Sequence, residues 1–202
     1  PTNGIVRNLK NRDDWTKIRN LRMKENLITK PTSLMPINKI LEGSIPKKNS
    51  LIFKNNFIGE VQKGGRSEAL KIIHSFIKNR GQNYLSNISK PGISEKTCSR
   101  ISPHLTWGTI SSKEIIKLLN LNKINSQKNR STINSRNLNA IKSRLSWRCH
   151  FIQKLESQPS IETSCMHPFY DKLRKDNMNT DYYKAWKEGL TGYPFIDACM
   201  RS

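Results

Sequence analysis

Apolar residues recur every three or four positions along much of this chain, and that period predicts amphipathic helices. The clearest short example is the stretch 66–80, whose apolar face consists of Ala69, Leu70, Ile73, Phe76 and Ile77. A longer example is marked by Leu138, Ile141, Leu145, Cys149, Ile152 and Leu155. A third helix is predicted over 11–26, where Trp15, Ile18 and Leu21 share a face.

Capping residues place the ends of these helices and predict shorter ones. A glycine ends a helix through a left-handed conformation, and a proline follows or opens one. Two signals mark helix ends: Gly81 after the helix over 66–80, and Gln158-Pro159 after the long helix. Three signals mark helix starts: Ser102-Pro103 before a short helix ending near Gly108, the capping box Ser111–Glu114 before a helix to about Asn120, and Thr180 before a helix through Trp186. The chain therefore consists mainly of short and medium helices.

No stretch alternates apolar and polar residues at period two over a length that predicts a strand. Breakers at Pro31, Pro36, Gly43 and Pro46 predict a loop or linker over 27–63 with one short turn of helix. The polar, basic stretch 122–135 is predicted to be a mobile connection. The predicted fold class is all-α.

Positive charge is concentrated in the middle of the chain. The formal net charge is +21, from 36 Lys and Arg against 15 Asp and Glu. Between Glu68 and Glu156 there are sixteen basic residues and only two acids, and 115–155 contains no acid. Clustered cations without acids favour a polyanion such as a nucleic acid as partner. A solvated surface in a chain of biased composition is the alternative, and a membrane surface fits less well because no basic helix carries a broad aromatic face.

The remaining composition narrows the class of protein. The 202 residues suit one ordinary domain, with no apolar run that could span a bilayer and no signal peptide. The four cysteines are widely spaced, which disfavours a metal site and a disulfide framework and favours reduced thiols in a cytoplasmic protein. The chain begins with Pro1 and ends inside a helical pattern at Ser202, so we expect a fragment truncated at both ends.

The run from Trp186 to Arg201 is the most specific pattern in the chain. Its Gly189 and Pro194 predict a helix stop, a tight turn and a helix start, which an ordinary helical corner would explain. The run also resembles the W-x-x-G-x-T-G-[YF]-P-x-[IV]-D-A-x-M-R signature of the photolyase/cryptochrome family. Upstream, Cys98 to Ser111 resembles a second family block, [TC]-S-x-L-S-P-x-L-x-x-G-x-[IL]-S.

The resemblance implies an organisation and a set of partners. It makes residues 64–202 the first part of the all-helical FAD-binding domain, and residues 1–63 a connection from a missing N-terminal antenna domain. It implies FAD as the cofactor and UV-damaged DNA as the partner of a monomeric protein. The expected activity is that of a deoxyribodipyrimidine photo-lyase, with the fragment inactive by itself.

The turn before Ser102-Pro103 is the candidate cofactor site. Hydroxyls and free N–H groups at a helix start can hold an anion, although capping alone would also explain the serines. By resemblance, this turn holds the FAD pyrophosphate. The cofactor contacts expected from the family motif are Tyr84, Cys98, Ser99, Arg100, Ile101, Ser102 and Arg148. Cys98 stands where many members have Thr, so one strong hydroxyl donor is lost.

The long helix carries the candidate DNA contacts. Arg144, Trp147, Arg148 and Phe151 are predicted to lie on one face, suited to stacking on bases and pairing with phosphates. In the family motif E-x-x-W-R-E-F, the Trp packs on the flipped lesion and the Glu contacts it. Trp147 matches, but Arg144 replaces the Glu, and a guanidinium cannot accept the hydrogen bonds of a carboxylate.

Three functions remain open at this point. Light-driven, FAD-dependent repair of cyclobutane pyrimidine dimers is the first, and Arg144 somewhat favours a cryptochrome-type photoreceptor without repair. A cofactor-free basic helical module that binds nucleic acid is the third. Both flavin-dependent hypotheses, repair and photoreception, require the serine-bearing turn and the corner at Gly189–Pro194 to fold together into one phosphate-binding site. Trp107 and Trp186 are expected in the core.

Overall fold

The structure is a computed structural model that describes residues 4–37, 43–44, 61–126, 133–173 and 178–201, with side chains outside the description for 122–126. Every regular element within these residues is a helix, so the predicted all-α fold is confirmed. The α-helices are α1 (Trp15–Lys24), α2 (Arg66–Lys78), α3 (Tyr84–Asn87), α4 (Pro91–Thr97), α5 (Ser102–Thr106), α6 (Ser112–Ser126), α7 (Ser135–Ser157), α8 (Thr180–Glu188) and α9 (Pro194–Arg201). Short 3₁₀ turns are η1 (Arg12–Asp14), η3 (Arg80–Asn83), η4 (Pro159–Glu162) and η5 (Pro168–Tyr170).

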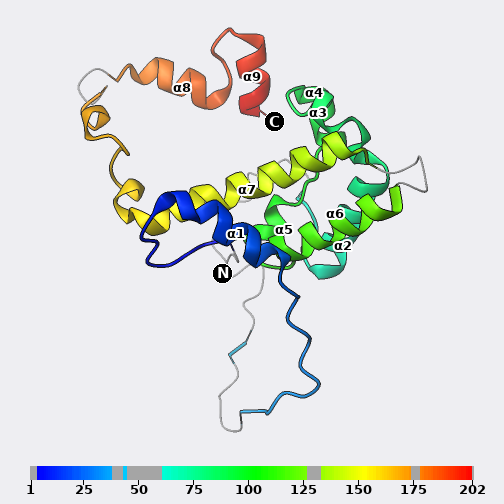
Figure 1. Cartoon of the computed structure of the whole chain (residues 1–202). Coiled ribbons are helices and arrows are strands. Elements are labelled where there is room, and N and C mark those ends of the chain that lie inside the picture. Colours follow the sequence, from blue (N-terminus) through cyan, green and yellow to red (C-terminus); the bar gives the residue numbers. More distant parts are fainter. Residues whose placement is uncertain (1–3, 38–42, 45–60, 127–132, 174–177, 202) are drawn as a thin grey trace.

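The long helix α7 crosses the body of the molecule and contacts α3, α6, η3 and η4 (Figure 1). Helix α6 contacts α1, α2 and α7, while α3 also contacts α7. Their apolar faces meet in one core made of Val6, Trp15, Met23, Ala69, Ile73, Phe76, Ile77, Tyr84, Ile101, Leu105, Ile110, Ile115, Ile116, Leu119, Ile133, Leu138, Ile141, Leu145 and Cys149. The apolar positions that predicted the helices over 66–80 and 138–155 supply much of this core.

Gly81 lies inside η3, after the end of α2, at a position where no side chain fits. A Cβ atom on Gly81 would lie 2.7 Å from the Phe76 carbonyl oxygen and 2.7 Å from Ile133. Helix α2 stops at Lys78 with Asn79 as its C-cap, and the chain turns through η3 into α3. The predicted helix over 66–80 is confirmed as far as Lys78, but Gly81 does not close it through a left-handed conformation, and its missing side chain instead makes room for Ile133.

Several predicted boundaries differ from the structure. Helix α6 continues to Ser126 instead of stopping near Asn120, because no Gly or Pro interrupts its backbone hydrogen bonding. Of the predicted connection over 122–135, residues 122–126 instead belong to α6, and residues 127–132 lie outside the described residues. The side chain of Asn179, and not Thr180, caps α8. Ser102 is the first residue of α5, whose N-cap position is taken by Ile101 without a side-chain cap.

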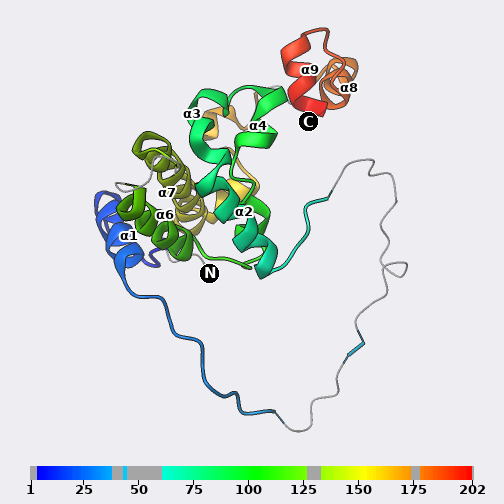
Figure 2. The ribbon, with the colours of Figure 1, turned by 90° about the vertical axis from the view of Figure 1, so that its right-hand side faces the viewer.

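The predicted linker over 27–63 is only partly described. Residues 27–37, 43–44 and 61–63 contain no helix, and residues 38–42 and 45–60 lie outside the description. Figures 1 and 2 show residues 27–37 leaving the body of the molecule. In contrast, α1 packs on α6, and Trp15 and Met23 join the core. The division at residue 63 remains a prediction.

The α8–α9 pair lies at one end of the molecule. Its two helices pack on each other, and both views place the pair beyond α3 and α4, away from α2 and the core (Figures 1 and 2). No side chain of this pair belongs to the core cluster. None of the described helices combines the length and apolar character needed to cross a membrane.

Candidate functional site

The turn between α4 and α5 has an unusual backbone that its surroundings hold in place. Arg100 adopts a left-handed conformation with φ +56°, which costs energy for a residue with a side chain. The next residue, Ile101, is buried in the core and anchors the turn. The turn is therefore fixed by packing, although its own sequence contains no glycine.

One arginine ties this turn to α2. The Arg80 guanidinium donates to the carbonyl oxygens of Cys98 at 2.5 Å and Ser99 at 3.4 Å. It also donates to the Ile72 carbonyl at 3.0 Å and the Ser75 hydroxyl at 3.0 Å. Burial, and then the nearby charge of Arg100, lower the pKa of Arg80. A single half-buried side chain thus links the middle and the end of α2 to the turn.

The carbonyl groups of the turn are engaged, and so is the Cys98 amide, which donates to the Ser94 carbonyl at 2.7 Å, but the amides from Ser99 onward are not. Beyond the two bonds from Arg80, Gln62 Nε2 donates to the Arg100 carbonyl at 2.7 Å. The N–H groups of 99–102 have no acceptor among the described residues, nor do the hydroxyls of Ser99 and Ser102. Successive free amides with two hydroxyls form a concave donor set that suits an anion. We call residues 98–102 the amide cradle.

Helix α7 supplies positive charge and a tyrosine contact beside the amide cradle. Burial raises the pKa of Tyr84, and the charge and hydrogen bonding of Arg144 partly oppose that shift. Cys98 also lies within electrostatic reach of Tyr84, and burial raises the pKa of its thiol. Arg148 Nη2 donates to the Leu105 carbonyl at 3.3 Å, at the end of α5. The structure therefore brings Tyr84, Cys98 and Arg144 together, with Arg148 on the adjacent turn of α7.

The donor set fits FAD in chemical type. A pyrophosphate carries negative charge and accepts hydrogen bonds, and the amide cradle offers the unpaired amides of 99–102 and two hydroxyls, next to an Arg100 guanidinium that lies 3.7 Å from the Glu95 carboxylate. Tyr84 is buried with its ring edge-on to Phe76 at 5.4 Å between centroids, so only its hydroxyl end is oriented toward Arg144 and Cys98. Ile101 faces the core and can offer its backbone alone.

The four α7 residues predicted on one face divide into two groups. Arg144 and Arg148 approach α3 and α5, as described above. Trp147 instead stacks beside Phe151, with ring centroids 5.7 Å apart, and contacts His150 edge-on. It lines a small pocket with Trp15. All four positions lie at spacings of three and four in the continuous helix α7 and so share one side of it, but their side chains contact different neighbours.

The corner between α8 and α9 has the predicted local form. Gly189 is left-handed with φ +66°, and α9 begins at Pro194. The Asp197 carboxylate accepts from Thr191 N at 2.8 Å, Thr191 Oγ1 at 2.6 Å and Gly192 N at 3.1 Å, and these bonds lower its pKa. However, the structure does not bring this corner to the amide cradle, so the predicted joint cradle does not form (Figure 1).

Both tryptophans predicted in the core are exposed, and the reasons are local. Trp107 follows α5 as its C-cap and is 84% exposed. Trp186 lies on α8, where only Tyr183 stacks beside it, and it is 48% exposed. Those placements correct the prediction for both residues.

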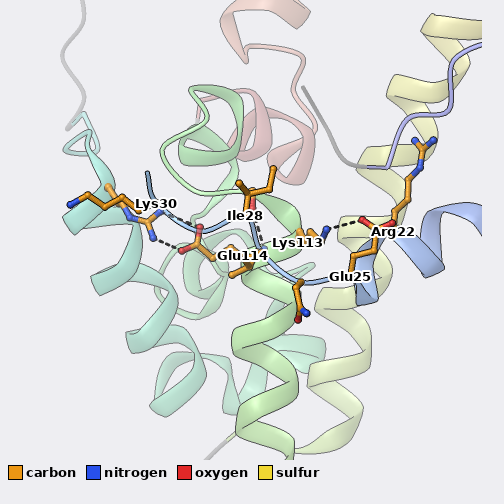
Figure 3. A pocket seen from close by; sticks show the side chains of 10 residues that line it. Arg22, Glu25, Ile28, Lys30, Lys113 and Glu114 are labelled. Carbon is orange, nitrogen blue, oxygen red and sulfur yellow. Dashed lines mark hydrogen bonds and ion pairs between the residues drawn. The ribbon is translucent and has the colours of Figure 1, made fainter. Parts of the chain in front are cut away.

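The pocket beside α1 does not provide a better site. It has a volume of about 920 Å³ and lies between α1, residues 25–30 and the start of α6 (Figure 3). Its two acids are already paired, Glu25 with Lys113 at 3.0 Å and Glu114 with Arg66 (Figure 3). The Arg22 guanidinium is bonded to the Ile5 carbonyl. Its charges therefore stabilise the packing of α1 and α2 on α6 and leave little for a ligand.

Sequence reasoning missed Arg80 and Gln62. Both are polar residues without a motif, and their partners lie 18 to 38 residues away in the chain. The one available signal was that Arg80 follows directly on a well-defined amphipathic helix, and that signal does not identify a partner.

Comparison with known proteins supports the interpretation of the chain as part of an FAD-binding domain. Residues 141–202 match the family described as FAD binding domain of DNA photolyase. A deoxyribodipyrimidine photo-lyase of Streptomyces griseus is 26% identical over 86% of this chain and 34% of its own length. That of Buchnera aphidicola is 30% identical over 78% of this chain and 31% of its own length. Cryptochrome-1 of Arabidopsis thaliana is 25% identical over 83% of this chain and 26% of its own length.

The chain thus spans about a third of these relatives or less, and they include both photolyases and cryptochromes. With the all-helical fold and the matched FAD-binding region, these similarities show that the chain belongs to the photolyase/cryptochrome family.

Proposed function

We propose that this chain forms part of an FAD site in which the amide cradle holds the pyrophosphate. The observation that carries the proposal is the division of the turn: the carbonyls of 98–100 are bound by Arg80 and Gln62, and the amides of 99–102 have no acceptor among the described residues. Ser99 and Ser102 add hydroxyl donors, and Arg100 adds charge. The left-handed Arg100 presents neighbouring amides to one side, which is the geometry of an anion-binding concavity.

The other predicted contacts orient the cofactor in this proposal. The Tyr84 hydroxyl and the Cys98 thiol remain neutral at neutral pH, since burial raises the pKa of both, so each can act as a donor. Arg144 and Arg148 place positive charge along α7 beside them. FAD, when bound, supplies light-driven electron transfer that splits a cyclobutane pyrimidine dimer. The protein contributes position, charge and the exclusion of water.

We further propose UV-damaged DNA as the substrate. The acid-free stretch 115–155 includes all but the end of α7, so the surface that presents Arg144 and Trp147 attracts phosphates. Trp147 is half-exposed on α7 and can stack on a base that has left the duplex. Binding in this proposal weakens steeply as salt rises.

Flavin retention tests the cofactor proposal directly. The double substitution Ser99→Asp with Ser102→Asp places two carboxylates against the pyrophosphate, so the purified protein should lose its yellow flavin absorbance. A matched control is Ser89→Asp with Ser135→Asp, two exposed serines outside the amide cradle, which adds the same charge and should retain flavin. Equal flavin content in both double variants would contradict the proposal, and a colourless parent protein would favour the cofactor-free nucleic-acid module.

Illumination separates repair from signalling. Under blue light, a repair enzyme restores thymines in an oligonucleotide that contains a cyclobutane dimer. A cryptochrome-type photoreceptor would undergo flavin photoreduction and leave the dimer intact. The receptor is kept as second candidate because Arg144, in place of the lesion-contacting Glu, is engaged with Tyr84. Arg144→Glu should then increase dimer binding if the position faces the lesion.

A further inference from the structure

The four peptide groups between Cys98 and Ser102 share one hydrogen-bonding arrangement. In each of them the carbonyl oxygen accepts a hydrogen bond, while the N–H group has no acceptor among the described residues. In chain order, the donors to the four carbonyls are Arg80 Nη1, Arg80 Nη2, Gln62 Nε2 and Leu105 N. All four peptide groups thus have their acceptor side bound by the protein and their donor side open.

A hydrogen bond at the carbonyl changes the N–H of the same peptide group. It polarises the whole peptide unit, which makes the N–H a stronger donor. The effect is larger when the bond comes from a charged donor, as it does from Arg80 Nη1 at 2.5 Å from the Cys98 oxygen. The second bond from Arg80, to the Ser99 oxygen, is longer at 3.4 Å. The positive charge of Arg80 therefore reaches the open side of the amide cradle through these peptide groups.

Arg80 lacks a counter-ion in the part of the chain that the structure describes. It is half-buried, and its acceptors are three carbonyl oxygens and the Ser75 hydroxyl, all of them neutral. None of the ion pairs among these residues includes Arg80, and a second cation, Arg100, acts on it and lowers its pKa. Arginines that leave water are normally paired with an anion. The missing charge points to an anion at the open amides.

We propose that Arg80 and Gln62 are positioning residues of the FAD site: they bind the carbonyl side of the amide cradle and thereby set the affinity of its amides for the pyrophosphate. This role rests on the proposed function, in which the amide cradle holds the pyrophosphate. It requires that affinity follow the charge of the donor at positions 62 and 80, although neither side chain contacts the cofactor. A role in the shape of the turn alone would require only a donor of suitable length.

Position 62 gives the cleaner test, because Gln62 lies outside the core and its bond to the turn is exposed. FAD is removed from the purified protein and titrated back, with binding followed by flavin fluorescence. Gln62→Lys should tighten FAD binding about threefold, since a charged donor forms the stronger hydrogen bond. Gln62→Met has a similar length but no donor, and it should weaken binding about threefold. Val61→Lys, which adds the same charge at a neighbouring exposed residue, should change the affinity by less than about twofold.

Nuclear magnetic resonance without FAD shows whether the effect passes through the peptide group. In Gln62→Met, the carbonyl ¹³C resonance of Arg100 and the amide ¹⁵N resonance of Ile101 should both move, because the two atoms belong to one peptide group. The amide of Ser99 belongs to a peptide group that Arg80 binds, so its resonance should stay in place.

Two substitutions at position 80 separate charge from hydrogen bonding. Arg80→Lys keeps the charge, and Arg80→Gln keeps a neutral donor. FAD affinity should be about threefold higher in Arg80→Lys than in Arg80→Gln. Urea unfolding of both variants measures their stabilities. Equal affinities, or affinities that differ only as the free energies of unfolding do, would limit Arg80 to the shape of the turn and contradict the proposal.

This role and the proposed function fail in different ways. If the parent protein binds FAD, and Gln62→Lys and Gln62→Met bind it equally well, the amide cradle holds the cofactor and only the positioning role is overturned. An Arg100 carbonyl resonance that does not move in Gln62→Met has the same consequence. A parent protein that binds no FAD overturns both.

Discussion

The two segments that resemble family motifs are held in opposite ways. The segment from Cys98 to Ser111 depends on distant residues: Ile101, Leu105 and Ile110 are buried in the core, and Arg80 binds its carbonyls. The segment from Trp186 to Arg201 is held by its own residues, through Asp197, Thr191 and Gly192. Similarity of sequence therefore says little about whether a segment needs a core to keep its shape.

This difference accounts for the separation of the α8–α9 pair from the amide cradle. A corner closed by its own hydrogen bonds keeps its form without packing on the rest of the molecule. Its aromatic side chains remain largely exposed, including Tyr193 and Phe195. The amide cradle, in contrast, exists only where α2, α5 and α7 meet. We therefore expect the two regions to respond differently to equivalent substitutions.

The largest expected difference is between two phenylalanines. Phe76 on α2 is 0% exposed, so Phe76→Ala should lower the free energy of unfolding by about 3–5 kcal/mol. Phe195 on α9 is 65% exposed, and Phe195→Ala should change it by less than about 0.5 kcal/mol. Urea unfolding followed by circular dichroism measures both. A comparable loss in the two variants would show that α9 packs on a core.

Removing the link between α2 and the turn should have the next largest effect. Arg80→Met leaves the carbonyls of Cys98 and Ser99 without their donor and should cost about 3 kcal/mol in unfolding free energy. Arg80→Lys should recover only part of this, because an ammonium cannot reach four acceptors in the guanidinium geometry. Lys78→Met, at an exposed position at the end of α2, is the control and should leave the free energy of unfolding nearly unchanged. Flavin content should fall in the order wild type, Arg80→Lys, Arg80→Met.

Local helix-capping signals predicted much of the fold. Gln158 and Gly189 each ended a helix where expected, since capping depends on the residue itself and its near neighbours, whereas α2 ended at Lys78, before Gly81. The apolar period likewise identified the buried faces of α2 and α7. The amide cradle was located because its residues are contiguous in sequence.

The remaining features depend on contacts between distant segments. Arg80 reaches the turn across the interface of α2, and Trp107 was assigned to the core although it is largely exposed among the described residues. Hydrophobic character alone does not place a tryptophan inside, because a short helix such as α5 buries few positions. The different contacts of Arg144, with Tyr84, and of Trp147, in a pocket beside Trp15, also depend on α3 and α1, which the pattern of α7 does not encode.

Two glycines of the corner offer a smaller, matched comparison. Both have positive φ, +66° at Gly189 and +81° at Gly192, but only Gly189 is crowded, with a Cβ position 2.9 Å from Arg201 and 3.0 Å from the Asp197 carbonyl. Gly189→Ala should destabilise the corner by about 1–3 kcal/mol and Gly192→Ala by about 1 kcal/mol. Hydrogen exchange of the α9 amides reports this directly. Protection in α2 should not change, and a change there would mean that the regions are coupled.

The smallest effect concerns pH and is confined to the corner. Hydrogen bonds from Thr191 and Gly192 hold the pKa of Asp197 below its ordinary value of 3.8. Because the folded pKa is depressed, this carboxylate stabilises the corner above pH 3.8, and the contribution is lost as the pH falls through the lower, folded value. The amide resonances of Thr191 and Gly192 should shift together in that acid range, while those of the amide cradle do not follow them. Asp197→Asn should abolish the shift and lower α9 protection at neutral pH, since an amide oxygen is a weaker acceptor than a carboxylate. If the core unfolded at the same pH as these two amides moved, the corner would not be the self-contained unit that its hydrogen bonds describe.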